Sequence, residues 1–145
     1  MPAGATRKGT TVSLDDNRRS SRALLFLTLL YGTASLIHFA HNATFLREYP
    51  NLPMWLTASG VWAAWWAVTA VGAIGVYVYL RVSRTPGLVI VAVYGLLGFA
   101  GLDHYVVAPV SAHSLVMNST ILLEVATAGT LLAFVAYRGL RDRIM

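Results

Sequence analysis

Four long apolar stretches constrain the fold of this chain more than any other feature of its sequence. They cover residues 23–45, 54–80, 88–107 and 114–137. As helices they can each cross a hydrocarbon layer about 30 Å thick, which takes roughly 20 residues. Hydrophobic residues make up 57% of the chain and charged residues only 12%. Because a backbone in lipid must satisfy its own hydrogen bonds, the sequence predicts an all-α integral membrane protein.

Short connections that contain proline separate the four stretches, at residues 49–53, 84–87 and 108–109. Connections of this length place sequential helices side by side and antiparallel. We therefore expect one membrane domain, residues 23–137, folded as an antiparallel bundle of four transmembrane helices. A basic tail at residues 1–22, expected to be disordered, precedes this domain, and a second basic tail at residues 138–145 follows it.

Positive charge is unevenly divided between the two ends of the predicted bundle. Ten of the 11 lysines and arginines fall in the tails and the second connection, and Arg47 alone falls in the first connection. An excess of Lys and Arg marks the cytoplasmic side of a membrane protein. We therefore expect both termini to be cytoplasmic and the bundle to lie in the inner or plasma membrane. The basic character then reports topology, so the expected partner is the lipid bilayer and not nucleic acid.

Histidines gather at one level of this predicted topology. All four fall near helix ends that face the extracytoplasmic side: His38, His41, His104 and His113. Asp103 lies beside them, and Glu124 lies deeper, about 15 Å along the fourth helix at 1.5 Å per residue. Polar side chains inside a span turn towards the bundle interior, because lipid would leave them without partners. The sequence therefore predicts a His/Asp/Glu cluster in the outer part of the bundle.

The first hypothesis for this cluster is a metal centre. His38 and His41 have a spacing common in chelating helices, and His104 and His113 flank the third connection. Nitrogen and oxygen ligands suit Zn, Fe, Cu or Mn, and two histidines from different helices can hold haem b. The chain contains no cysteine, so thiolate ligands are excluded. A bound metal or haem would serve redox or metal-dependent chemistry.

The second hypothesis is metal-free lipid chemistry. Glu124 and Asp103 would be the catalytic acid and base, beside a binding pocket walled by Trp62, Trp65 and Trp66. These tryptophans lie too deep in the second stretch to form an interfacial belt. Four helices in about this length, with an irregular first loop containing Pro and Trp, resemble in layout the sterol isomerase-type membrane proteins of the emopamil-binding class. This resemblance implies a lipid or sterol-type isomerase, or a lipid binder.

A third hypothesis makes the chain an accessory subunit of a larger membrane complex, or one copy of a homo-oligomer. The polar cluster would then be a structural hydrogen-bond network at the water boundary. This hypothesis predicts that the chain purifies with its partner and that it tolerates replacement of single histidines.

Overall fold

Every regular element in the described part of the chain is a helix. The computed structural model describes residues 7–144, with side chains over residues 15–141; residues 1–6 of the predicted tail and residue 145 lie outside the described residues. The elements are α1 (Arg7–Thr44), α2 (Ala58–Arg81), α3 (Arg84–Leu97), η1 (Gly98–Leu102), α4 (Asp103–Val107), η2 (Val110–Ala112) and α5 (Leu115–Ile144), where η denotes a 3₁₀ helix. Helix α1 therefore begins within the segment that we expected to be disordered.

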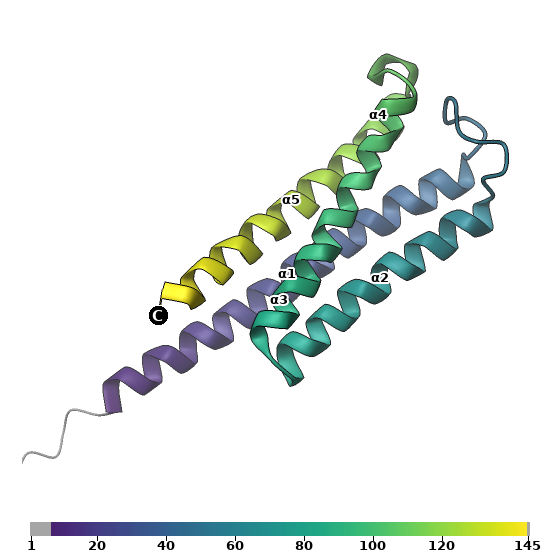
Figure 1. The fold of residues 1–145 in the computed structure, drawn as a ribbon. Helices are drawn as coiled ribbons and strands as arrows, with labels where there is room; N and C mark the ends of the chain where they lie inside the picture. The colour runs from purple at the N-terminus through teal and green to yellow at the C-terminus, as the bar shows by residue number, and fades with distance from the viewer. Residues whose placement is uncertain (1–6, 145) are drawn as a thin grey trace, which may run out of the picture.

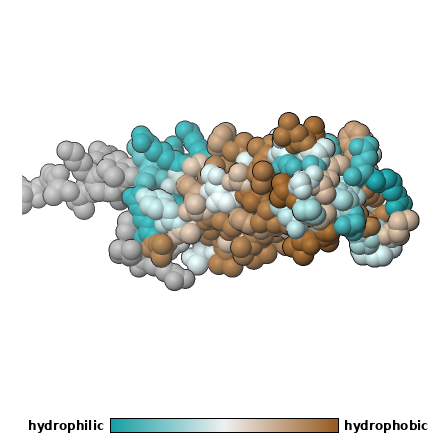
Figure 2. Space-filling view, turned by 90° about the horizontal axis from the view of Figure 1, so that it is seen from above, coloured by the Kyte–Doolittle hydropathy of each residue, from teal (hydrophilic) through white to brown (hydrophobic). Residues whose placement is uncertain are grey.

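Four helical segments are long and apolar enough to cross a membrane: Asp15–Thr44, Ala58–Arg81, Arg84–Val107 and Leu115–Arg141. They confirm the predicted all-helical architecture with four helices of membrane-spanning length. Between 17% and 39% of their most apolar windows is buried, so most of their apolar side chains face outwards. Figure 2 shows the resulting hydrophobic surface between two more hydrophilic ends. An apolar outer surface this large is typical of membrane proteins.

Consecutive long helices run in opposite directions (Figure 1). The α1–α2 loop and the turn around η2 lie at one end of the bundle, and the α2–α3 turn and the C-terminus lie at the other. At the terminal end, Arg138 of α5 donates to Asp16 of α1 over 3.3 Å. Arg84 at the start of α3 donates to Asn17 of α1. These polar contacts connect α1 to α5 and to α3 at the terminal end of the bundle.

The third membrane-length segment changes its winding midway, from α3 through η1 to α4. Close packing against α5 accompanies this change. A methyl group added at Gly98 would lie 2.6 Å from Cβ of Ala128 and 2.7 Å from the hydroxyl oxygen of Tyr31. The backbone of η1 thus approaches its neighbours where a side chain would prevent it. A mid-helix 3₁₀ stretch often marks strain or a functional position, and this one leads directly to Asp103 and His104.

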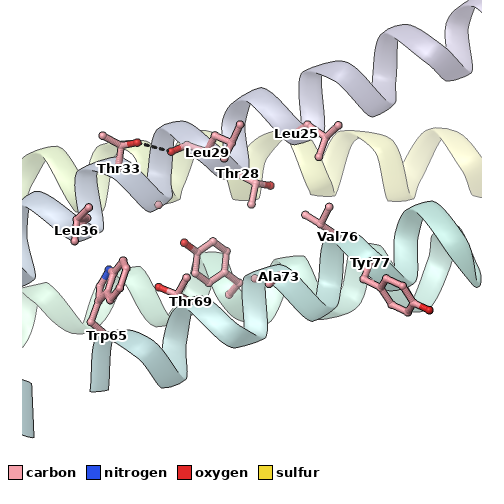
Figure 3. A pocket seen from close by; sticks show the side chains of 13 residues that line it. Leu25, Thr28, Leu29, Thr33, Leu36, Trp65, Thr69, Ala73, Val76 and Tyr77 are labelled. Carbon is pink, nitrogen blue, oxygen red and sulfur yellow. Dashed lines mark hydrogen bonds between the residues drawn. The ribbon is translucent and has the colours of Figure 1, made fainter. Parts of the chain in front are cut away.

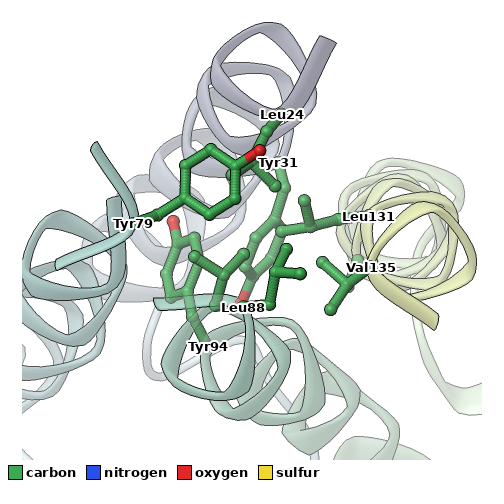
Figure 4. Packing of buried hydrophobic residues seen from close by; sticks show 9 residues of the cluster. Leu24, Tyr31, Tyr79, Leu88, Tyr94, Leu131 and Val135 are labelled. Atoms are coloured by element: carbon green, nitrogen blue, oxygen red, sulfur yellow. The ribbon is translucent and has the colours of Figure 1, made fainter. Parts of the chain in front are cut away.

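A hydrophobic cluster fills the half of the bundle nearest the termini (Figure 4). Its buried members come from all four long helices and are Leu24, Tyr31, Tyr79, Leu88, Val91, Tyr94, Ala128, Leu131 and Val135. The ring centroids of Tyr31 and Tyr94 lie 4.5 Å apart on the side of the cluster that faces away from the termini. Polar side chains gather in the opposite half, so the bundle is divided into an apolar half and a half that can hold a polar site.

Candidate functional site

A histidine and a carboxyl face each other inside the polar half. His38 of α1 and Glu124 of α5 are each only 2% exposed. Nε2 of His38 lies 3.7 Å from Oε2 of Glu124. The two residues meet because α1 places Ser35, His38 and Asn42 on one face at helical spacing, and α5 places Thr120 and Glu124 opposite them.

The hydrogen-bond partners of His38 favour one tautomer of its ring. The Thr120 hydroxyl donates its proton to the Met117 carbonyl over 3.0 Å, so its oxygen is available to accept. Nδ1 of His38 lies 3.4 Å from that oxygen, and it donates there in the tautomer that carries the proton on Nδ1. Nε2 is then an acceptor that faces the Glu124 carboxyl. The 3.7 Å between Nε2 and Oε2 of Glu124 is longer than a direct hydrogen bond, so the two residues form a close pair of ionisable groups with no hydrogen bond between these atoms.

Several buried polar atoms find no hydrogen-bond partner among residues 15–141, and we call them the open atoms. They are Thr28 Oγ1, Tyr31 OH, Ser35 Oγ, Asn42 Oδ1, Trp65 Nε1, His104 Nδ1, His113 Nε2 and Glu124 Oε2. Most of them follow the polar face of α1 or lie opposite it. Buried polar groups are nearly always hydrogen-bonded in folded proteins. A concentration of open atoms is therefore the pattern expected where water or a ligand completes a site.

His104 of α4 lies between His38 and the end of the bundle that carries the α1–α2 loop and η2. Its ring centroid is 5.4 Å from that of His38. The amide nitrogen of Asn42 donates to its Nε2 over 3.4 Å. Because Nε2 accepts, the proton of the neutral ring is on Nδ1, which is an open atom. His104 thus presents an N–H group that needs an acceptor.

His113 presents the complementary group. Its Nδ1 donates to the Pro109 carbonyl over 3.1 Å, so Nε2 of the neutral ring is an acceptor. This Nε2 is also an open atom. The ring centroids of His104 and His113 are 6.1 Å apart. A water molecule or a ligand hydroxyl could therefore accept from one ring and donate to the other.

Tyr49, from the loop after α1, also belongs to this group, although the sequence analysis did not place it in the cluster. It is buried and its ring lies 4.9 Å from His104 and 5.8 Å from His41. Its hydroxyl is 2.9 Å from Nδ1 of His41. Burial raises the pKa of the Tyr49 phenol, so the phenol stays neutral and can donate to His41.

A cavity of about 360 Å³ adjoins the His38–Glu124 pair. Its polar lining comes from His38, Asn42, Asp103, His104 and Glu124. Its apolar lining includes Phe39, Leu52, Leu56, Val61, Ala64 and Leu97. A methyl group added at Gly101 would lie 3.3 Å from Oε2 of Glu124, so the missing side chain leaves the carboxyl uncovered. The cavity is large enough for a small organic group, and its polar lining comes from α1, α4 and α5.

The other predicted site residues lie at the margins of this cavity or away from it. Asp103 lines the cavity, but its side chain is exposed. The cavity wall on α2 is made by Gly60, Val61 and Ala64. Trp62, Trp65 and Trp66 contact one another edge to face, with ring centroids 5.9 Å and 4.8 Å apart, and Trp66 is 64% exposed. Of the three, Trp65 lines a separate groove between α1 and α2.

The arrangement of the histidines does not support a preformed metal centre. Within the described residues, no group of three or more His, Asp or Glu side chains is placed to hold a metal ion. The predicted chelating pair has different partners, since His38 faces Thr120 and Glu124 whereas His41 contacts Tyr49. Ligation by these two residues would require the rings to turn. As it stands, the geometry is that of a buried histidine–carboxyl pair beside a cavity.

Comparison of the chain with known protein families, curated proteins and solved structures found no match.

Proposed function

We propose that this is a four-span integral membrane protein that binds the polar end of a hydrophobic small molecule and moves protons to and from it. The observation that carries this proposal is the His38–Glu124 pair. Both side chains are buried, their facing atoms are 3.7 Å apart, and they lie on the wall of a cavity. An ionisable group in the middle of a membrane bundle is costly to maintain, and such groups serve function by default.

The pair provides an acid and a base in one site. In its neutral form the Glu124 carboxyl can donate a proton to one atom of a bound molecule, and Nε2 of His38 can remove a proton from another. The proton on the imidazolium then returns to the carboxylate, so the pair is restored. With a carbon–carbon double bond as the target, one C–H bond forms, another breaks and the double bond shifts. Such an isomerisation is acid–base chemistry, for which His38 and Glu124 supply the two groups.

The positive-inside rule supports an orientation in which this site lies in the extracytoplasmic half of the cell's inner or plasma membrane, with both termini in the cytoplasm. The lack of cysteine makes the orientation simple to test. We expect Asn51→Cys and Ser111→Cys to react with a membrane-impermeant maleimide on intact cells. We expect Ser83→Cys to react only after the membrane is opened. The opposite pattern would contradict the orientation.

The test of the function is what purifies with the protein. We expect material prepared in mild detergent without chelator to carry a near-stoichiometric hydrophobic molecule with one polar end, found by mass spectrometry of the organic extract. Elemental analysis and a visible spectrum of the same sample should show neither a stoichiometric transition metal nor a Soret band. An extract free of such a molecule, after purification in two different detergents, would contradict the proposal.

A bound transition metal or haem is a second candidate, favoured by the ring nitrogens of His104 and His113. Both are buried, and both are open atoms in the described part of the chain. Imidazole nitrogens without a hydrogen-bond partner are available as ligands to Zn, Fe, Cu or Mn, or to haem iron. This candidate predicts stoichiometric metal that is lost in His104→Gln and His113→Gln but kept in His41→Gln. Unchanged metal content in all three variants would exclude it.

A further inference from the structure

A long groove runs along the outer face of the α1–α2 pair, separate from the cavity at the His38–Glu124 site (Figure 3). It has a volume of about 540 Å³, within the range of roughly 300–1,000 Å³ typical of small-molecule sites. Leu25, Leu29 and Leu36 face Trp65, Ala73 and Val76 across it. On α1 it extends from Leu25 to Leu36, about 16 Å at 1.5 Å per residue.

The groove exists because Tyr94 of α3 is inserted beneath α1 and α2 and forms its floor. A methyl group added at Gly72 would lie 2.8 Å from Cε1 of the Tyr94 ring, and one added at Gly32 would lie 3.3 Å from its hydroxyl oxygen. Two glycines thus admit this ring where α1 and α2 would otherwise pack directly. The space above the ring is open to the surroundings of the bundle.

Those surroundings identify the kind of occupant. The groove lies within the membrane-length segments of α1 and α2, and its rim residues Leu29 and Tyr77 are 70% and 63% exposed. At this depth the neighbouring medium is hydrocarbon. A groove that is long, mostly apolar and open to hydrocarbon fits a hydrocarbon chain.

The groove also leads to the candidate site. Its outer end is formed by Leu36 and Trp65. One turn further along the same faces of these helices, Phe39 on α1 and Val61 on α2 line the cavity that holds Glu124. A molecule lying along the α1–α2 seam would therefore place one end beside the His38–Glu124 pair.

We propose that the groove binds the hydrocarbon chain of the same molecule whose polar end occupies the cavity. The substrate class is thus a long-chain amphiphile that enters sideways from the bilayer. Its polar end is neutral, a hydroxyl or carbonyl group, because a charged end would have to lose its water beside a buried carboxyl. This inference rests on the proposed function for the position of the polar end, whereas the groove itself rests on its own lining.

The test uses the one tryptophan that lines the groove. In a background with Trp55, Trp62 and Trp66 replaced by phenylalanine, Trp65 is the remaining indole. The purified protein is titrated in nanodiscs with 9,10-dibromooctadecan-1-ol, whose bromine atoms quench indole fluorescence on contact. We expect saturable quenching, because the probe chain occupies a site and is not simply dissolved in the lipid.

A matched pair of variants tests the location. Ala73 lines the groove and is exposed, so Ala73→Leu fills the groove without crowding the core. Ala67, also exposed on α2, lies about 240° around the helix from it, at 100° per residue. We expect Ala73→Leu to raise the half-saturating probe concentration about tenfold, which is about 1.4 kcal/mol, and Ala67→Leu to leave it unchanged. Equal half-saturating probe concentrations for the parent protein and Ala73→Leu would overturn the proposal that the groove binds the chain. Non-saturable quenching in the parent protein would overturn it as well.

A third variant separates this inference from the proposed function. If Glu124→Gln weakens probe binding while Ala73→Leu does not, the polar site remains and the groove is wrong. If Ala73→Leu weakens binding while Glu124→Gln and His38→Gln both leave it unchanged, the groove remains and the polar end lies elsewhere. Weakening by variants at both places supports both proposals.

Discussion

Replacement of Gly87 by alanine is expected to lower the free energy of unfolding by about 2 kcal/mol. Gly87 is in the first turn of α3, directly after the α2–α3 turn. A methyl group there would lie 2.5 Å from Cβ of Tyr79 and closer still to its backbone nitrogen and Cα. A backbone cannot rotate away as a side chain can, so α3 would have to move off α2. Overpacking of this kind costs about 1–3 kcal/mol, and we expect the upper end of that range, reduced by the helix propensity of alanine, worth about 1 kcal/mol.

Gly139→Ala is the matched control for this prediction. Gly139 is in α5, and a methyl group there would meet no heavy atom within 4 Å in the described part of the chain. The same substitution should therefore be neutral or stabilise by up to about 1 kcal/mol. Equilibrium unfolding in mixed micelles, followed by far-ultraviolet circular dichroism, measures both. If the two variants were equally stable, the close approach of α3 to α2 at Tyr79 would be wrong.

Replacement of Glu124 by glutamine is expected to reduce proton exchange between water and the bound molecule by about 10²–10⁴-fold. The amide keeps the volume and most hydrogen-bonding capacity of the carboxyl but holds no exchangeable acid proton at this position. His38→Gln should have a comparable effect, because it removes the partner 3.7 Å away. The double variant should be little worse than either single variant, since the two residues act as one unit. Deuterium incorporation into the co-purified molecule in D₂O, followed by mass spectrometry, measures the rate.

Glu48→Gln provides the control for this series. It makes the same chemical change at an exposed position in the α1–α2 loop. Glu48→Gln should leave the exchange rate unchanged. The thermal unfolding temperature of Glu124→Gln should remain close to that of the parent protein, which would show that this variant is correctly folded. Exchange at the parent rate in Glu124→Gln would show that the proton comes from another group.

The number of long helices could be predicted from the sequence, because an apolar stretch of membrane length has few alternatives to a helix. The gathering of His38, His104 and His113 at one end also follows from counting residues along antiparallel helices. The hydrogen-bond partners of each ring nitrogen could not be predicted in this way, since they depend on side-chain rotation. The pairing of His38 with Glu124 needed the structure for this reason. Glu124 is deep in α5, but His38 is itself more than a turn inside the end of α1.

The tryptophans illustrate what periodicity leaves open. Their depth in the second apolar stretch argued against an interfacial belt, but depth does not determine how a helix is rotated about its axis. In the structure Trp66 faces outwards and Trp65 borders the groove. Tyr49 illustrates the opposite difficulty. The loop that carries it has no periodicity, so its return into the bundle depends on contacts with His41 and His104 that no local pattern encodes.

The hydrophobic cluster beneath the site has an electrical consequence. Leu24, Leu88, Leu131 and their neighbours fill the terminal half of the bundle, and Arg138 and Asp16 pair below them. In the orientation proposed above, a proton on Glu124 would therefore exchange with the extracytoplasmic side and would be insulated from the cytoplasm. Moving one charge across the whole membrane involves about 2.3 kcal/mol per 100 mV. A proton that stops at Glu124 crosses only the outer part of that field, so the site can cycle protons without discharging the membrane potential.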